Sequence, residues 1–126
     1  MHSVLFVGIG GFFGACSRYL ITQIMKEFFP KFPFGTLLSN LLAGFLIGFI
    51  IGFERHSASL DNNLKLFLTT GLLGGLSTFS TYSLETIVMI ENGQYAAAVA
   101  NTLLNLSLSL IFVVFGLIAV KILLKA

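Results

Sequence analysis

The sequence has 126 residues, of which 56% are hydrophobic and 10% are charged, and its mean hydropathy is +0.98. A soluble domain of this length carries far more charge, so the composition excludes that class and predicts an integral membrane protein. The formal net charge of +2 is not gathered into a basic patch, which argues against a nucleic-acid partner.

Four apolar segments occupy most of the chain, at residues 4–25, 33–53, 65–90 and 95–122. Each reaches the roughly 20 residues that a helix needs to cross a bilayer. The pattern therefore predicts an all-α membrane protein in which residues 1–126 form a single domain of four transmembrane helices. The N-terminus lacks the Lys/Arg-rich start of a signal peptide, so no segment is expected to be removed.

The first segment has small residues at helical spacing, with Gly10 and Gly14 four residues apart. Such spacing lets membrane helices approach closely and predicts a packing face. Arg18 follows at the same interval, and a charge inside a span is costly. It either extends to the membrane surface or faces a cavity or a partner. Cys16 is the only cysteine, so no disulfide can form within the chain.

Pro33 is well placed to begin the second helix, whose face carries Asn40, Gly44, Gly48 and Gly52 at four-residue intervals. The glycines again predict close packing. Asn40 heads this face and has two interpretations. Its amide could join two helices by a hydrogen bond, or its two N–H donors could bind an anion.

The third segment contains the stretch TTGLLGGLSTFSTYSLE, from Thr69 to Glu85, which does not suit a continuous helix. Its glycines weaken the helical backbone, and the Ser and Thr residues that follow can bond nearby carbonyls instead. We expect a break in mid-membrane, from Gly74 to Thr78. Broken membrane helices usually lie at ion sites, and carbonyl oxygens freed by the break suit a hard cation.

The fourth segment carries Asn101, Asn105 and Ser109 at four-residue spacing, so their side chains form one polar stripe. The stripe could line a pore, or it could join helices by hydrogen bonds. It offers more polar groups than packing requires, which favours the pore.

The basic residues are spread almost evenly over the two sides of the membrane. The positive-inside rule then gives almost no preference, so the chain is expected to insert in both orientations and to form an antiparallel homodimer. With four crossings, four basic residues lie on the side of the termini, namely Arg55, Lys65, Lys121 and Lys125. Three lie on or nearest to the other side, namely Arg18, Lys26 and Lys31.

Arg18 and Glu85 fall in the same half of the membrane and are candidates for an ion pair.

The polar groups in these segments favour a small anion as the transported species. Amide and hydroxyl donors and the positive edges of aromatic rings can replace water around it, and no strong cationic cluster would trap it. Enzyme signatures are absent from the sequence, which has no HExxH motif, no Walker loop and no plausible Ser-His-Asp set.

At GTLLSNLLAG in the second segment and TGLLGGLSTFSTYSLE in the third, the sequence resembles the Fluc (CrcB) family of fluoride channels. The resemblance covers the whole chain, including the four spans. It implies an antiparallel dual-topology homodimer in the cell membrane, with two fluoride pores and a central sodium ion. It also implies that fluoride is exported passively, which relieves the toxicity of this anion.

The resemblance assigns roles to residues that match the family's motifs. Asn40 corresponds to a pore asparagine, and Phe79 to the first of two aromatic residues whose ring edges meet fluoride. The second is commonly Phe and is Tyr82 here, which adds a phenol that could donate to the anion. Ser80 and Thr81 correspond to the hydroxyls between the rings.

The same resemblance covers three further sets of residues. Gly74 and Ser77 correspond to positions whose backbone carbonyls hold the sodium ion. Arg18 and Glu85 also match motif positions, as vestibule or structural charges. The family's polar track along its fourth helix falls, with variable residue types, at Asn101, Asn105 and Ser109.

Two other interpretations remain open. A dual-topology drug or cation exporter of the small multidrug resistance type has a similar size, but it needs a membrane carboxylate in its first helix for proton coupling. The first segment has no Asp or Glu before Glu27, which lies at its end. A subunit that only assembles with others would carry no ions, and it would leave the polar stripe and the broken helix unexplained.

Overall fold

The computed structural model describes residues 2–57 and 59–125, and these residues form helices joined by short connections, without a β-strand. The first two helices are α1 (His2–Phe28) and α2 (Phe34–His56). The third hydrophobic segment folds as α3 (Asn62–Leu66), the π-helix η1 (Phe67–Leu73), α4 (Gly74–Leu76) and α5 (Ser80–Glu91). The fourth consists of α6 (Tyr95–Leu103), the π-helix η2 (Leu104–Leu108) and α7 (Ser109–Lys125).

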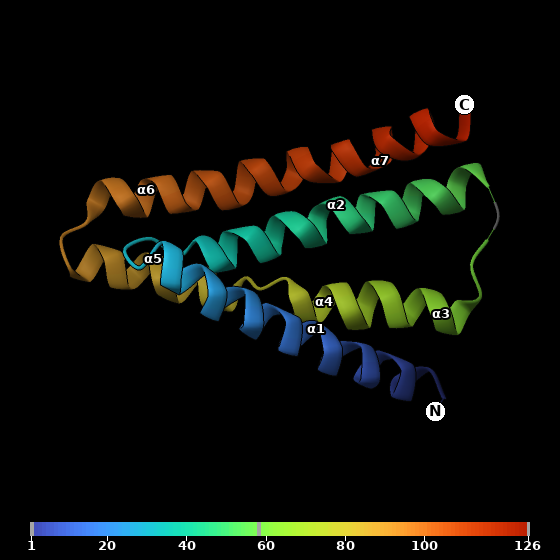
Figure 1. Cartoon of the computed structure of the whole chain (residues 1–126), viewed down its shortest axis with the longest axis horizontal. Helices are drawn as coiled ribbons and strands as arrows, with labels where there is room; N and C mark the ends of the chain where they lie inside the picture. The colour runs from blue at the N-terminus through green and yellow to red at the C-terminus, as the bar shows by residue number, and fades with distance from the viewer. Residues whose placement is uncertain (1, 58, 126) are drawn as a thin grey trace.

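The helices lie side by side along one long axis (Figure 1). α2 packs against α7 on one side and against α1 on the other. The start of α1, the end of α7 and the α2–α3 connection lie at one end of the bundle, and the α1–α2 and α5–α6 connections lie at the other. The connections between the helices therefore alternate between the two ends of the bundle.

Three of the described helices are long and apolar enough to cross a membrane: His2–Phe28, Phe34–His56 and Tyr95–Leu124. Most of α1 is exposed in the single subunit, including the large apolar side chains of Phe12 and Phe13. An exposed apolar surface of this extent is typical of a helix that faces lipid. The chain is therefore a multi-pass membrane protein, as its composition predicts.

The third hydrophobic segment is interrupted, as predicted, but the break lies after the glycines. The helix continues to Leu76, and Ser77 then takes an extended conformation, with φ −80° and ψ 156°. Because α5 begins at Ser80, residues 77–79 separate two helical pieces. The expected start of the break at Gly74 is therefore wrong, since Gly74 and Gly75 are still helical.

Glycines mark the closest approaches between helices. A Cβ atom at Gly14 would meet the carbonyl oxygen of Leu72, so α1 can lie directly against η1. A Cβ atom at Gly48 would meet the carbonyl oxygen of Val113, so α2 can lie directly against α7. The packing faces predicted for the first two helices are thus confirmed, and small residues let the backbones touch.

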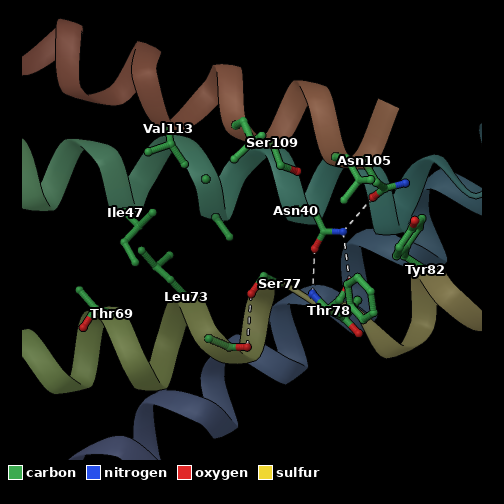
Figure 2. Close-up of a pocket in the computed structure, with 16 residues that line it drawn as sticks. Asn40, Ile47, Thr69, Leu73, Ser77, Thr78, Tyr82, Asn105, Ser109 and Val113 are labelled. Carbon is green, nitrogen blue, oxygen red and sulfur yellow. Dashed lines mark hydrogen bonds between the residues drawn. The ribbon is translucent and has the colours of Figure 1, made fainter. Parts of the chain in front are cut away.

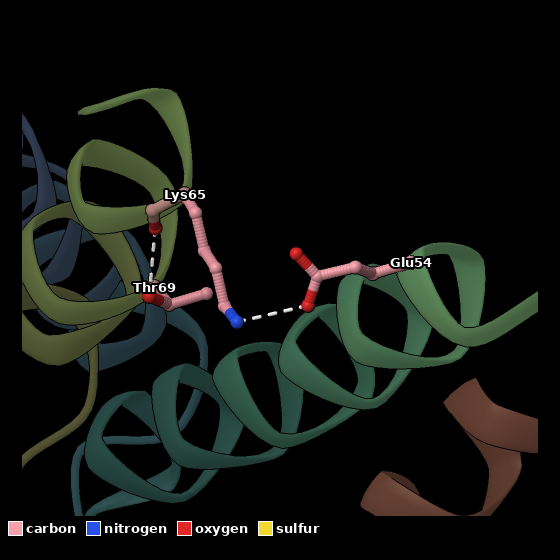
Figure 3. Close-up of polar contacts among 3 residues, drawn as sticks. All are labelled: Glu54, Lys65 and Thr69. Carbon is pink, nitrogen blue, oxygen red and sulfur yellow. Dashed lines mark hydrogen bonds and ion pairs between the residues drawn. The ribbon is translucent and has the colours of Figure 1, made fainter. Parts of the chain in front are cut away.

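An ion pair joins the end of α2 to α3 (Figure 3). Lys65 Nζ lies 2.8 Å from Glu54 Oε1, and the hydroxyl of Thr69 donates to the backbone carbonyl of Lys65 at 2.7 Å. Asp61 caps α3 by accepting from the backbone N–H of Asn63 at 3.2 Å. Both charged side chains are partly exposed, so the pair contributes at most about 1 kcal/mol and mainly orients the connection.

Candidate functional site

A groove of about 440 Å³ lies between α2, the helix formed by η1 and α4, and the helix formed by η2 and α7. Apolar side chains such as Ile47, Leu73 and Val113 line one end of it (Figure 2). Polar groups gather towards the other end, where the third helix breaks. The groove brings together seven of the residues predicted from the sequence: Asn40, Gly74, Ser77, Phe79, Tyr82, Asn105 and Ser109.

Asn40 holds the break by replacing a backbone hydrogen bond. Its Oδ1 atom accepts from the N–H of Thr78 at 2.8 Å, and its Nδ2 atom donates to the carbonyl of Thr78 at 3.2 Å. In a continuous helix, the N–H of Thr78 would donate to the carbonyl of Gly74. Within the described chain that carbonyl has only a long contact of 3.5 Å from the hydroxyl of Ser77. Asn40 thus joins α2 to the break between α4 and α5, which is the interhelical role considered for it.

Two helix ends of opposite polarity meet at the break. The helix that ends at Leu76 has partial negative charge on its last carbonyls, and α5 has partial positive charge on its first N–H groups. Thr78 Oγ1 accepts from the N–H of Thr81 at 3.2 Å and so caps α5. No group of three or more His, Cys, Asp or Glu that could hold a metal occurs in the described residues.

Phe79 and Tyr82 form an aromatic pair beside the break. Their ring centres lie 5.3 Å apart and their planes make an angle of 66°, which is an edge-to-face arrangement. In the single subunit Phe79 is 71% exposed, whereas Tyr82 is only 8% exposed. Packing thus holds the ring of Tyr82, while the ring of Phe79 is available to a partner or an ion that meets its positive edge.

The predicted stripe on the fourth helix is divided between the groove and the protein interior. Asn105 and Ser109 line the groove, but Asn101 is fully buried. Asn105 Oδ1 accepts from Asn40 Nδ2 at 2.9 Å, and Asn101 Nδ2 donates to the hydroxyl of Thr86 at 2.9 Å. The stripe therefore joins helices at its first two positions and lines the groove at its last two.

Ser80 and Thr81 are not among the residues that line the groove. Ser80 is exposed and is the first residue of α5. The hydroxyl of Thr81 accepts from the hydroxyl of Thr78 at 3.2 Å, which adds to the cap of α5. In the single subunit these two hydroxyls therefore belong to the start of the helix rather than to the groove.

Arg18 and Glu85 do not form the expected ion pair within the described subunit. Arg18 Nε donates to the carbonyl of Gly75 at 3.0 Å, and Glu85 Oε2 accepts from the hydroxyl of Thr36 at 2.9 Å. Each group instead has one hydrogen-bond partner on another helix, and Glu85 Oε1 is buried without a partner in the described subunit. Glu85 also lines a second groove of about 340 Å³, together with Lys26, next to the α1–α2 connection.

Thr36 and Thr86, for which the sequence predicted no role, take part in hydrogen bonds between helices. Thr36 is 1% exposed, and Thr86 links Asn101 to the carbonyl of Tyr82, to which its hydroxyl donates at 2.9 Å. Thr36 lies one helical turn before Asn40, and Thr86 lies one turn after Tyr82. The helical period was therefore the signal that could have placed them with the site.

Comparisons of the sequence with known proteins agree on one family. The family described as CrcB-like protein, Camphor Resistance (CrcB), matches residues 5–117. The chain is 52% identical over 113 residues to the fluoride-specific ion channel FluC of Clostridium perfringens, across 89% of this chain and 88% of that protein. It is 42% identical over 122 residues to FluC of Campylobacter fetus, across 95% of this chain and 94% of that protein. The chain therefore belongs to the CrcB family, whose members are ion channels and not enzymes.

Proposed function

We propose that this chain is a fluoride-selective channel of the cell membrane, which lets fluoride leave the cell passively and so relieves its toxicity. The observation that carries the proposal is the groove at the helix break, where Asn40, Phe79 and Ser109 lie together. The choice of anion is supported by relatives that match nearly the whole chain and are named fluoride-specific ion channels.

The groove offers an anion two kinds of partner that can replace its water. Amide and hydroxyl groups such as those of Asn40 and Ser109 can donate hydrogen bonds, and the ring of Phe79 can present its positive edge. None of the described side chains that line the groove is Lys or Arg, so no fixed positive charge would retain the anion. Closely set donors compensate the dehydration of small fluoride better than that of larger chloride.

The remaining predicted pathway residues fall into two groups in this proposal. Ser80 is exposed at the start of α5 and is available to a path that runs past the rings. Thr81 and Asn101 bond to other side chains of the subunit, so they act by holding the path. Tyr82 combines both features, because its ring borders the groove and is itself buried.

The break also suits the structural sodium ion that the resemblance implies. The carbonyl of Gly74 has lost its usual N–H partner, and the carbonyl of Ser77 belongs to an extended residue. Neutral oxygens at a helix C-terminus attract a hard cation, and two from each subunit of a dimer would supply four ligands. Replacing sodium by N-methylglucamine should therefore lower the thermal stability of the purified dimer. An unchanged melting temperature would argue against this ion.

An antiparallel homodimer with two pores completes the proposal. Phe79 is 71% exposed in the single subunit, and a second copy related by a two-fold axis in the membrane plane would cover it. The even distribution of Lys and Arg supports insertion both ways round. A cysteine added at the C-terminus of a Cys16→Ala variant should be labelled in only part of the molecules by an impermeant reagent applied to intact cells. Complete labelling or none would reject dual topology.

The central experiment measures the release of anions from liposomes that contain the purified protein. Vesicles loaded with potassium fluoride or potassium chloride are treated with valinomycin, and an ion-selective electrode follows the anion outside. We expect rapid release of fluoride and far slower release of chloride. Comparable rates for the two anions would refute the proposed selectivity, and no release of either would refute the channel. A drug exporter would release neither anion by this route.

A further inference from the structure

Four side chains form a continuous chain of hydrogen bonds that runs from α2 through η2 and α6 to α5. We refer to Asn40, Asn105, Asn101 and Thr86 as the amide relay. Asn40 Nδ2 donates to Asn105 Oδ1 at 2.9 Å, and Asn105 Nδ2 donates to Asn101 Oδ1 at 3.0 Å. Asn101 Nδ2 then donates to the hydroxyl of Thr86 at 2.9 Å. All members donate in the same direction, which lets the bonds strengthen one another.

Backbone groups fix this direction at both ends of the amide relay. The N–H of Thr78 can only donate, and it donates to Asn40 Oδ1. The carbonyl of Tyr82 can only accept, and it accepts from the hydroxyl of Thr86. The orientations of the three amides between these ends therefore follow from the chemistry of their neighbours.

The amide relay occupies both N–H donors of Asn40, because Nδ2 also donates to the carbonyl of Thr78. In this arrangement Asn40 has no amide donor left for an anion. Asn101 is 0% exposed and does not line the groove, so water cannot replace a bond that it loses. An anion that binds at Asn40 must therefore rearrange the relay.

A turnover of two amides achieves this and keeps the relay side chains paired with one another. Asn105 Nδ2 gives up the bond that it also donates to the backbone carbonyl of Asn101 at 2.8 Å, and that carbonyl keeps the N–H of Leu104 as a donor. Once Asn105 turns over, its Nδ2 faces the groove beside that of Asn40, and both can donate to the anion. Asn101 also turns over, so that its Nδ2 donates to Asn105 Oδ1 and its Oδ1 requires a donor. The hydroxyl of Thr86 becomes that donor by rotating away from the carbonyl of Tyr82, because a hydroxyl both donates and accepts.

We propose that Thr86 is a further positioning residue of the anion pathway. Its hydroxyl accepts from Asn101 when no anion is bound and donates to Asn101 when an anion is bound at Asn40. Thr86 is not among the residues that line the groove, so it acts on the anion through Asn101 and Asn105. This inference rests on the proposed function, because it assumes that the groove carries an anion.

Thr86→Val keeps the shape of the side chain and removes its hydroxyl, and Thr86→Ser is the matched control that keeps the hydroxyl. We expect Thr86→Val to release fluoride from liposomes about fivefold more slowly or worse, which is the cost of about one hydrogen bond. Thr86→Ser should stay close to the wild type. A Thr86→Val protein that assembles and conducts like the wild type would overturn the inference. A wild type that releases no fluoride would overturn the proposed function and the inference with it.

A second measurement follows the amides directly, in protein labelled with nitrogen-15 at asparagine. Fluoride should shift the side-chain amide resonances of Asn101 together with those of Asn40, although Asn101 is buried and does not line the groove. Asn62 is exposed in α3 and serves as the control that should not respond. In Thr86→Val the response of Asn101 should disappear. A wild-type titration in which Asn40 responds and Asn101 does not would overturn the inference, whether or not the variant folds.

Discussion

Asn40→Asp is the change that tests the groove most directly. Asp keeps the size of the side chain and can still accept from the N–H of Thr78, so the contact at the break remains. It loses the two N–H donations, to the carbonyl of Thr78 at 3.2 Å and to Asn105 Oδ1 at 2.9 Å. Its second carboxylate oxygen would then face two acceptors, and a negative charge would enter the proposed path.

The expected effect of Asn40→Asp on transport follows from the lost donor. A hydrogen bond to a charged group contributes about 1.5–3 kcal/mol. If the barrier rises by that amount, fluoride release slows by roughly 10- to 150-fold, since about 1.4 kcal/mol is a factor of ten. Repulsion between the anion and the carboxylate acts in the same direction. The two lost bonds within the subunit cost about 2 kcal/mol of stability, and the carboxylate facing two acceptors adds to that cost, so assembly has to be measured beside transport.

Fluoride release from liposomes and size-exclusion chromatography in detergent measure these two effects separately. Asn62→Asp is the matched control, because it makes the same change of charge at an exposed position of α3. We expect it to conduct like the wild type. If Asn40→Asp assembles and also conducts like the wild type, Asn40 does not contact the anion. If both variants slow release equally, the effect comes from net charge and not from the groove.

Three further predictions concern the rings and the helix contacts. Phe79→Ile keeps an apolar side chain but loses the ring edge and an aromatic contact of at most about 1.5 kcal/mol, so fluoride release should fall while the elution volume stays that of the wild type. Tyr82→Phe removes only the phenol, and fluoride release should be preserved; a large loss would show that the phenol donates to the anion. A Cβ atom at Gly116 would meet the carbonyl of Phe45, so Gly116→Ala should lower stability by about 1–3 kcal/mol, and an unchanged melting temperature would contradict this close contact.

The regular parts of this fold could be predicted because their signals repeat with the period of a helix. The length of each apolar segment predicted the helices, and the spacing of Gly10 and Gly14 predicted a contact face on α1. Gly48 predicted the corresponding face on α2. The structure has both contacts, with η1 and with α7. Such patterns indicate which face of a helix carries small or polar residues, and they depend only on residues a few positions apart.

The partners of the polar residues could not be predicted in this way, because they lie far apart in the sequence. Asn40 bonds to Thr78, which is 38 positions away, and to Asn105, which is 65 positions away. Position in the same half of the membrane suggested a pair between Arg18 and Glu85. That reasoning fails because depth in the membrane does not decide which helix faces which, and each group has a partner on a neighbouring helix.

The position of the break shows how a distant side chain overrides local preference. Glycine costs about 1 kcal/mol in a helix, which is why the break was expected to begin at Gly74. Gly75 remains helical because it lies against α1, where a Cβ atom would be 2.8 Å from the carbonyl of Gly11. The helix ends instead where Asn40 takes the N–H of Thr78. That hydrogen bond leaves the carbonyl of Gly74 without its helical N–H partner, and a new helix, α5, begins at Ser80. For this reason the polar end of the groove and the break lie at the same place.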